Sequence, residues 1–171
     1  MSAIMRFAIR DATLADLPAI VAIYNEGVSS GIATADTSPV SVTHRETWFH
    51  AHNPKTRPVW VAERNGQIAG WLSFTDFYGR PAYSITAEVS LYVATAHRRQ
   101  GVARALLAQA VQRAPALDLS NLLAFVFDIN APSIALFEGV GFTRWGLLPT
   151  VAVLNRAECG LFILGLRLPP R

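Results

Sequence analysis

A continuous apolar run in the second half of the chain restricts the possible folds more than any other feature. The segment LLAFVFD, residues 122–128, contains no polar residue before its final aspartate. A strand of this kind is covered on both faces, as in α/β proteins. Helical patterns flank it, at 101–114 and from Asn130 to Gly139. The sequence therefore predicts a sheet with helices packed against it.

The rest of the chain supplies further strands and helices. Thr13 and Asp16 have the spacing of a capping box before a helix, and Asn65-Gly66 is typical of a hairpin turn. The other predicted elements are a strand at 6–10, a helix at 42–52, a strand at 84–94, and final strands near 142–153 and 160–168. No linker or repeat divides the sequence, so we expect a single domain over residues 1–171.

Composition excludes several classes of protein. The chain is 51% hydrophobic and 16% charged, with a net charge of +3, which is typical of a globular protein without a nucleic-acid surface. No apolar run reaches the roughly 18 residues of a membrane span, and the N-terminus lacks the apolar core of a signal peptide. We therefore expect a cytoplasmic protein that does not bind membranes. The single cysteine, Cys159, and the spacing of the four histidines indicate no metal site.

The turn HRRQGVARALL, residues 97–107, joins a predicted strand to a predicted helix. Free N–H groups and the helix dipole at a helix start bind phosphate, and Gly101 allows the backbone to approach a ligand closely. Arg98, Arg99 and Arg104 would add charge-assisted contacts. The pattern predicts a pyrophosphate site, although solvated loop charges are an alternative interpretation of these arginines.

Two motifs resemble the GNAT superfamily of N-acetyltransferases. RRQGVA at 98–103 is similar to its acyl-CoA-binding signature, Q/R-x-x-G-x-G/A, and NAPSIALFEGVGF at 130–142 resembles its N-x-x-S-x-x-L-[YF]-x-x-x-G-F segment. Residues 24–37 and 77–93 further resemble the phosphinothricin and methionine sulfoximine acetyltransferase subfamily. The resemblance implies an α/β fold, the GNAT acyl-CoA N-acyltransferase fold. Its mixed, mostly antiparallel sheet is flanked by about four helices, and its central strands splay apart.

The resemblance also implies acetyl-CoA as co-substrate, with its pantetheine arm between the splayed fourth and fifth strands. The residues implied to bind it are Leu91, Tyr92, Val93, Arg98, Arg99, Gln100, Gly101, Val102, Ala103, Arg104, Asn130 and Ser133. Asn130 could instead cap the following helix, and the two roles are compatible.

Glu88 is the residue implied to act as general base, because an amine must lose its proton before it attacks a thioester. Alternation places Glu88, Ser90 and Tyr92 on one face of their strand. Phe137 stands where many GNAT enzymes have a tyrosine that protonates the departing thiolate. Tyr92 or a water must then serve, or the thiolate leaves unassisted. Cys159 lies far from both motifs in the sequence, which favours direct transfer in a ternary complex over a covalent acyl-enzyme.

The subfamily resemblance implies a small amino-acid-like acceptor, such as phosphinothricin or methionine sulfoximine. The residues implied to bind it are Tyr24, Asn25, Ile32, Thr34, Arg80, Tyr83 and Glu88. Residues 149–164 depart from the subfamily pattern. A peptide or protein amine, a polyamine, or a non-catalytic acyl-CoA-binding module therefore remain alternatives. The resemblance also implies a homodimer, with residues near the cleft supplied across the interface.

Overall fold

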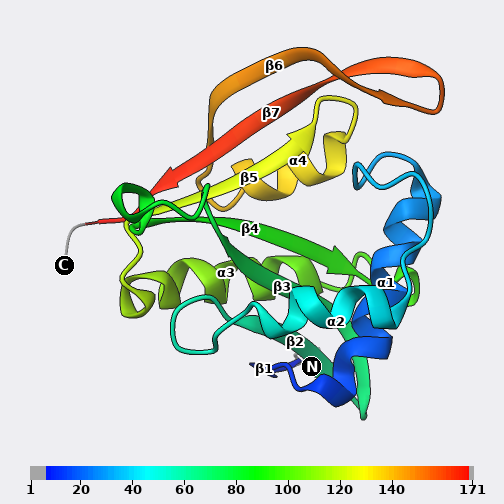
Figure 1. Cartoon of the computed structure of the whole chain (residues 1–171), viewed down its shortest axis with the longest axis vertical. Coiled ribbons are helices and arrows are strands. Elements are labelled where there is room, and N and C mark those ends of the chain that lie inside the picture. The colour runs from blue at the N-terminus through cyan, green and yellow to red at the C-terminus, as the bar shows by residue number, and fades with distance from the viewer. Residues whose placement is uncertain (1–6, 170–171) are drawn as a thin grey trace, which may run out of the picture.

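The computed structural model describes residues 7–169, which form a seven-stranded sheet with helices on both faces (Figure 1). The strands are β1 (Ala8–Asp11), β2 (Val59–Arg64), β3 (Gln67–Asp76), β4 (Thr86–Val93), β5 (Asn121–Phe127), β6 (Thr143–Leu154) and β7 (Ala157–Arg167). The α-helices are α1 (Leu17–Ser30), α2 (Val42–His50), α3 (Val102–Arg113) and α4 (Ala131–Glu138). The predicted start of the first strand at residue 6 and both ends of the predicted domain lie outside the described residues.

The sheet has the order β1-β2-β3-β4-β5-β7-β6. Every neighbouring pair is antiparallel except β4 and β5, which are parallel. Within residues 7–169, none of the helices is long and apolar enough to cross a membrane.

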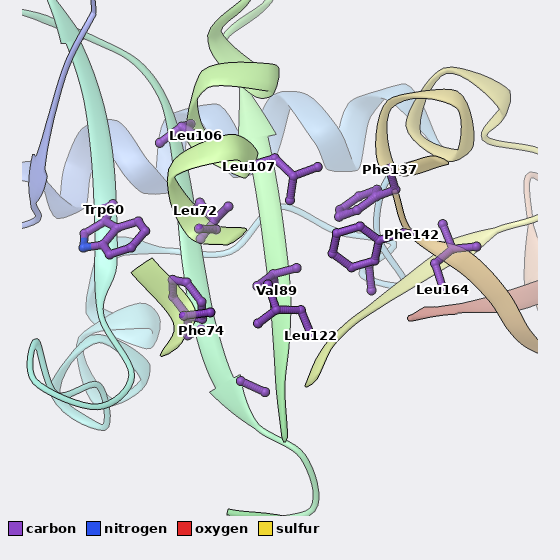
Figure 2. Close-up of a cluster of buried hydrophobic side chains, with 14 of the residues drawn as sticks. Trp60, Leu72, Phe74, Val89, Leu106, Leu107, Leu122, Phe137, Phe142 and Leu164 are labelled. Carbon is purple, nitrogen blue, oxygen red and sulfur yellow. The ribbon is translucent and has the colours of Figure 1, made fainter. Parts of the chain in front are cut away.

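Alternating residues of the central strands build two cores, one on each face of the sheet. On one face, Leu72 of β3 and Val89 of β4 pack with Leu106 of α3, and Figure 2 shows these side chains in one cluster. On the other face, Trp71 packs with α1 and donates a hydrogen bond of 3.1 Å from its indole nitrogen to the carbonyl of Ile20. Each fully buried leucine stabilises the fold by roughly 1.5–3 kcal/mol, so the alternation fixes the register of both strands.

Local signals in the sequence explain the boundaries of several elements. The capping box is confirmed: the Asp16 carboxylate accepts hydrogen bonds from the backbone N–H and the hydroxyl of Thr13, at 2.8 and 3.0 Å. The hairpin turn is also confirmed, because Asn65 and Gly66 both have positive φ angles, 51° and 75°. Two such residues match the twist of an antiparallel hairpin.

Other predicted boundaries were wrong by a few residues. The strand predicted from Ser84 begins at Thr86, because the N–H of Ser84 is bonded to the Pro81 carbonyl in a short 3₁₀ helix, η2 (Pro81–Tyr83). The last strand begins at Ala157 rather than at 160, because residues 155–156 form a tight turn with positive φ angles of 50° and 65°. This turn contains no glycine, so no Asn-Gly pair of the kind at residues 65–66 marks it.

The two central strands separate along their length. β4 and β5 are paired only where Thr86–Glu88 meets Asn121–Leu123. Beyond Glu88 the two strands diverge, as the green and yellow arrows of Figure 1 show. The predicted splay is therefore present, and it leaves one backbone edge of β4 without a strand partner among the described residues. Such an edge can pair with an extended ligand.

Candidate active site

A cavity of about 540 Å³ lies beside the free edge of β4 and the first turns of α3 and α4. Eleven of the residues predicted to bind the co-substrate line this cavity: Leu91, Tyr92, Val93, Arg98, Arg99, Gly101, Val102, Ala103, Arg104, Asn130 and Ser133. We call it the donor cavity. Phe137 also lines it and offers no proton donor.

The first turn of α3 has the geometry of a phosphate site. Gly101 stands at the N-cap with a φ angle of 84°, and the first helical hydrogen bond joins the N–H of Ala105 to its carbonyl. The N–H groups just before Ala105 therefore have no acceptor within the helix. Arg98, Arg99 and Arg104 are exposed around this turn and form no ion pair within the described part of the chain. Backbone donors and unpaired guanidinium groups together fit a diphosphate.

The predicted donor residue Gln100 does not line the donor cavity. Its side-chain amide donates to the carbonyl of Ala96 at 3.0 Å and accepts a hydrogen bond from Arg64 at 3.1 Å, which turns it away from the cavity. His97 lines the cavity instead, and its buried Nδ1 atom has no hydrogen-bond partner. His97 lies in the turn that we singled out from the sequence, but no motif spacing indicated that it would line the cavity.

Asn130 links α4 to the segment after α1. Its Oδ1 atom accepts a hydrogen bond of 3.3 Å from the N–H of Ser133, so its predicted capping role is confirmed. Its Nδ2 atom donates to the carbonyl of Ile32 at 3.3 Å. The contact brings Ile32, predicted to contact the acceptor, to the wall of the donor cavity.

A second cavity of about 360 Å³ lies on the face of the sheet that α1 and α2 cover, and we call it the acceptor cavity. Its lining is Tyr24, Ala33, Thr34, Ala35, Arg45, Trp48, Trp71, Ser73, Thr75, Glu88, Ser90, Tyr92, Phe125, Phe127 and Leu161. Phe125 and Phe127 belong to the apolar run that we expected to be covered on both faces. One face of that strand instead forms the wall of a cavity, which also favours apolar residues.

Glu88 lies in the acceptor cavity on the same face of β4 as Ser90 and Tyr92, as the alternation predicted. Burial raises the pKa of the Glu88 carboxyl above its ordinary value, and a hydrogen bond of 3.5 Å from the Ser90 hydroxyl offsets part of this effect. A carboxylate with a raised pKa is a stronger base, and it lies where an acceptor amine would enter.

Tyr92 lies between the two cavities and lines both. Its ring stacks on Trp71 with centroids 4.9 Å apart and packs against Gly27, where a Cβ atom would approach the ring to 3.1 Å. Its hydroxyl donates to the carbonyl of Ala33 at 3.4 Å. Burial raises the pKa of Tyr92 well above its ordinary value, so the phenol stays protonated at neutral pH.

The segment after α1 is held by a polar cluster at the rim of the acceptor cavity. The phenol of Tyr24 shares a hydrogen bond of 2.6 Å with the Thr34 hydroxyl and donates to Asp36 at 2.5 Å. Arg45 of α2 stacks over the Tyr24 ring, with its guanidinium carbon 4.2 Å from the centroid. Arg45 was not among the residues predicted to bind the acceptor, and the spacing of Arg45 and Trp48 on one helical face was the only available signal.

Besides Ile32, three residues predicted to contact the acceptor do not line the acceptor cavity. The side chain of Asn25 is bonded at 2.9 Å to both the N–H and the carbonyl of Val40, so it fixes the path of the chain before α2. Arg80 and Tyr83 are exposed at η2, before β4 begins. The described residues of one chain therefore give these three side chains no contact with the cavity.

A small cavity of about 60 Å³ fills the gap between β4 and β5. It shares Ser90 and Phe125 with the acceptor cavity, and Leu91 and Ser133 with the donor cavity, while Tyr92 lines all three. The splay therefore joins the turn before α3 at one end to the half-buried carboxylate of Glu88 at the other. This arrangement can bring a long thioester and an amine together.

Comparison with known proteins agrees with this geometry. Residues 20–142 match the acetyltransferase (GNAT) family model. The chain is 49% identical to the protein YwnH of Bacillus subtilis, over 88% of this chain and 92% of that one. It is 34% identical to an L-methionine sulfoximine/L-methionine sulfone acetyltransferase of Pseudomonas paraeruginosa, over 97% of both chains.

A solved structure extends the comparison to the fold. It is a GNAT superfamily phosphinothricin acetyltransferase from Sinorhizobium meliloti in complex with acetyl-CoA. It is 30% identical, with a TM-score of 0.90, over 96% of this chain and 89% of that one. The predicted fold and acetyltransferase activity are confirmed, and the predicted co-substrate is the one that this relative binds. The chain belongs to the GNAT family of acetyltransferases.

Proposed function

We propose that the protein transfers the acetyl group of acetyl-CoA to the primary amine of a small amino-acid-like compound of the phosphinothricin or methionine sulfoximine type. The observation that carries the proposal is the position of Glu88. This partly buried carboxylate lines a small acceptor cavity, and its strand continues into the donor cavity. The names of the relatives supply the acceptor class. A volume of about 360 Å³ suits a small molecule.

Glu88 acts as the general base in this proposal. The ammonium form of the acceptor has no lone pair, so its proton passes to the Glu88 carboxylate directly or through one water. The amine nitrogen then forms a bond to the acetyl carbon as the carbon–sulfur bond breaks, and the second proton of the nitrogen passes to the departing thiolate, which leaves as the CoA thiol. Because burial raises the pKa of Glu88, the carboxylate holds this proton more firmly than an exposed glutamate would.

In this proposal the Tyr92 hydroxyl rotates from the Ala33 carbonyl, 3.4 Å away, and donates a hydrogen bond to the leaving sulfur without giving up its proton. The pKa of an alkyl thiol is about 8.5, whereas burial holds the pKa of the Tyr92 phenol above its ordinary value of about 10. Complete proton transfer from the phenol to the thiolate would therefore be uphill. A hydrogen bond still stabilises the developing charge, and the thiolate needs no stronger acid to leave.

The direct test is an acetylation assay that follows thiol release with a panel of amines. We expect L-methionine sulfoximine, L-methionine sulfone and phosphinothricin to be acetylated faster than peptide N-termini or polyamines. Glu88→Gln should lower kcat about 100- to 10,000-fold near neutral pH and leave CoA binding intact. Preferential acetylation of peptides or polyamines would refute the acceptor class. An unchanged kcat in Glu88→Gln would remove Glu88 from the mechanism.

We also propose that the protein is a homodimer, as the family resemblance implies. The edge strand β6 carries exposed apolar side chains, which are Trp145, Leu147, Leu148, Val151 and Val153. An exposed apolar edge strand is a surface that another chain can cover. Sedimentation equilibrium measures the mass directly, and a monomer at micromolar concentration would refute this proposal.

A further inference from the structure

The acceptor cavity contains one charge of each sign. Among the described residues that line it, Arg45 is the only lysine or arginine and Glu88 is the only acidic residue. The remaining lining is aromatic, aliphatic or hydroxyl-bearing. A free amino acid also carries one charge of each sign, on its ammonium and carboxylate groups. The ammonium must approach Glu88 for proton transfer, which leaves the carboxylate for Arg45.

The guanidinium of Arg45 is oriented but not consumed by other contacts. It stacks over Tyr24 at 4.2 Å and lies near Trp48 at 5.2 Å, and only 20% of its side chain is exposed. Its nearest carboxylate oxygen, in Asp36, forms an ion pair with it at 3.7 Å, which is beyond hydrogen-bond distance, and that oxygen already accepts a hydrogen bond from Tyr24. Within residues 7–169 the guanidinium donates no hydrogen bond, so its N–H donors are available to a ligand.

We propose that Arg45 binds the α-carboxylate of the acceptor and thereby selects free α-amino acids over amides, peptides and simple amines. This inference rests on the proposed function. A planar guanidinium can bind a carboxylate through two parallel hydrogen bonds, and its position on the aromatic rings keeps that plane fixed. Low exposure strengthens these bonds. Arg80, the arginine that the sequence favoured for this task, is exposed outside the cavity.

The experiment compares L-methionine sulfone with its α-carboxamide, which keeps the amine and the side chain but loses the negative charge. We expect kcat/KM of the wild-type protein to be about 10- to 100-fold higher for the acid than for the carboxamide. This factor corresponds to the free energy of hydrogen bonds to a charged group. Arg45→Gln should reduce this preference to about twofold or less, and Arg45→Lys should restore part of it. Binding of the acid to the CoA complex should weaken in parallel, measured by the fluorescence of Trp48 and Trp71, which line the cavity.

Arg144→Gln is the matched control. The Arg144 guanidinium also stacks on a ring, 4.5 Å from the centroid of Phe162, and pairs with a carboxylate, Glu138, at 2.7 Å. It lines neither the donor nor the acceptor cavity. Its removal should leave the preference for the acid at the wild-type value. Thermal unfolding and CoA affinity of the Arg45 variants establish that they are folded.

The outcomes separate this inference from the proposed function. If the wild-type protein acetylates the acid and Arg45→Gln keeps the same preference, only the role of Arg45 is wrong. The same holds if Arg80→Gln abolishes the preference and Arg45→Gln does not, or if the wild-type protein shows no preference. If the wild-type protein acetylates peptides or polyamines but neither sulfone compound, the proposed acceptor class and this inference are both wrong.

Discussion

The role of Gly101 at the start of α3 can be tested by adding one methyl group. Gly101 has a φ angle of 84°, in the left-handed region where a residue with a Cβ atom is strained by about 1–2 kcal/mol. A Cβ atom built there meets no other atom within 4 Å, so Gly101→Ala causes strain without a steric clash. For a chain of 171 residues, this strain lowers Tm by about 2–8 °C.

Gly66 provides the matched control for this substitution. Its φ angle is 75°, and a Cβ atom there also meets nothing within 4 Å, so Gly66→Ala should lower Tm by a similar amount. Gly66 belongs to the turn between β2 and β3 and does not line the donor cavity. The two variants therefore match in strain and differ in their relation to the phosphate site.

Only Gly101→Ala should weaken CoA binding. Its methyl group stands at the wall of the donor cavity and displaces a diphosphate from the N–H groups of the first helical turn. Loss of one hydrogen bond to a charged group costs about 1.5–3 kcal/mol, so the Kd for CoA should increase about 10- to 100-fold. Calorimetry measures this Kd. Equal Kd values for Gly101→Ala and Gly66→Ala would show that the backbone at Gly101 does not bind the diphosphate.

Three further substitutions test the structure. Asp16→Asn should lower the free energy of unfolding by about 2 kcal/mol at neutral pH, because Arg10 holds the pKa of Asp16 at about 2. This difference in stability between wild type and variant, measured by urea unfolding, should disappear as the pH falls from 4 to 2 and Asp16 becomes protonated. Glu88→Gln should be more stable than wild type at pH 7 but not at pH 4, because burial disfavours the ionised carboxylate. Gly27→Ala should shift Tyr92, cost about 1–3 kcal/mol and lower kcat, measured by urea unfolding and steady-state kinetics. The reasoning on Asp16 would be contradicted if Asp16→Asn had the wild-type free energy of unfolding at neutral pH. The reasoning on Glu88 would be contradicted by a Glu88→Gln variant less stable than wild type at pH 7, and that on Gly27 by a Gly27→Ala variant with wild-type kcat.

The donor half of the site could be predicted because its parts are close together in the sequence. The turn at 98–104 and the start of α4 each lie within a few consecutive residues, and their contacts are largely those of backbone at a helix start. Local sequence patterns predict helix starts well. Gln100 was the exception, because its partner Arg64 is 36 residues away and no local pattern indicates that contact.

The acceptor half could be predicted only in part. Glu88 and Tyr92 followed from strand alternation together with the family resemblance. Arg45 did not, because α2 has a weakly amphipathic sequence and its position over Tyr24 depends on tertiary packing. The position of Asn25 outside the acceptor cavity could not be predicted for the same kind of reason, since its hydrogen bonds with Val40 join residues 15 positions apart.

The two halves of the site also differ in how they can change. In our proposal the turn before α3 binds the diphosphate through main-chain N–H groups, and few side-chain substitutions would remove these donors. The acceptor cavity is formed by side chains from separate elements, among them Arg45 of α2, Glu88 of β4 and Leu161 of β7. Substitution of one such side chain can change which amine is bound and leave the donor cavity intact. A family that shares one donor can therefore differ in its acceptors, and the acceptor has to be derived from side chains such as Arg45.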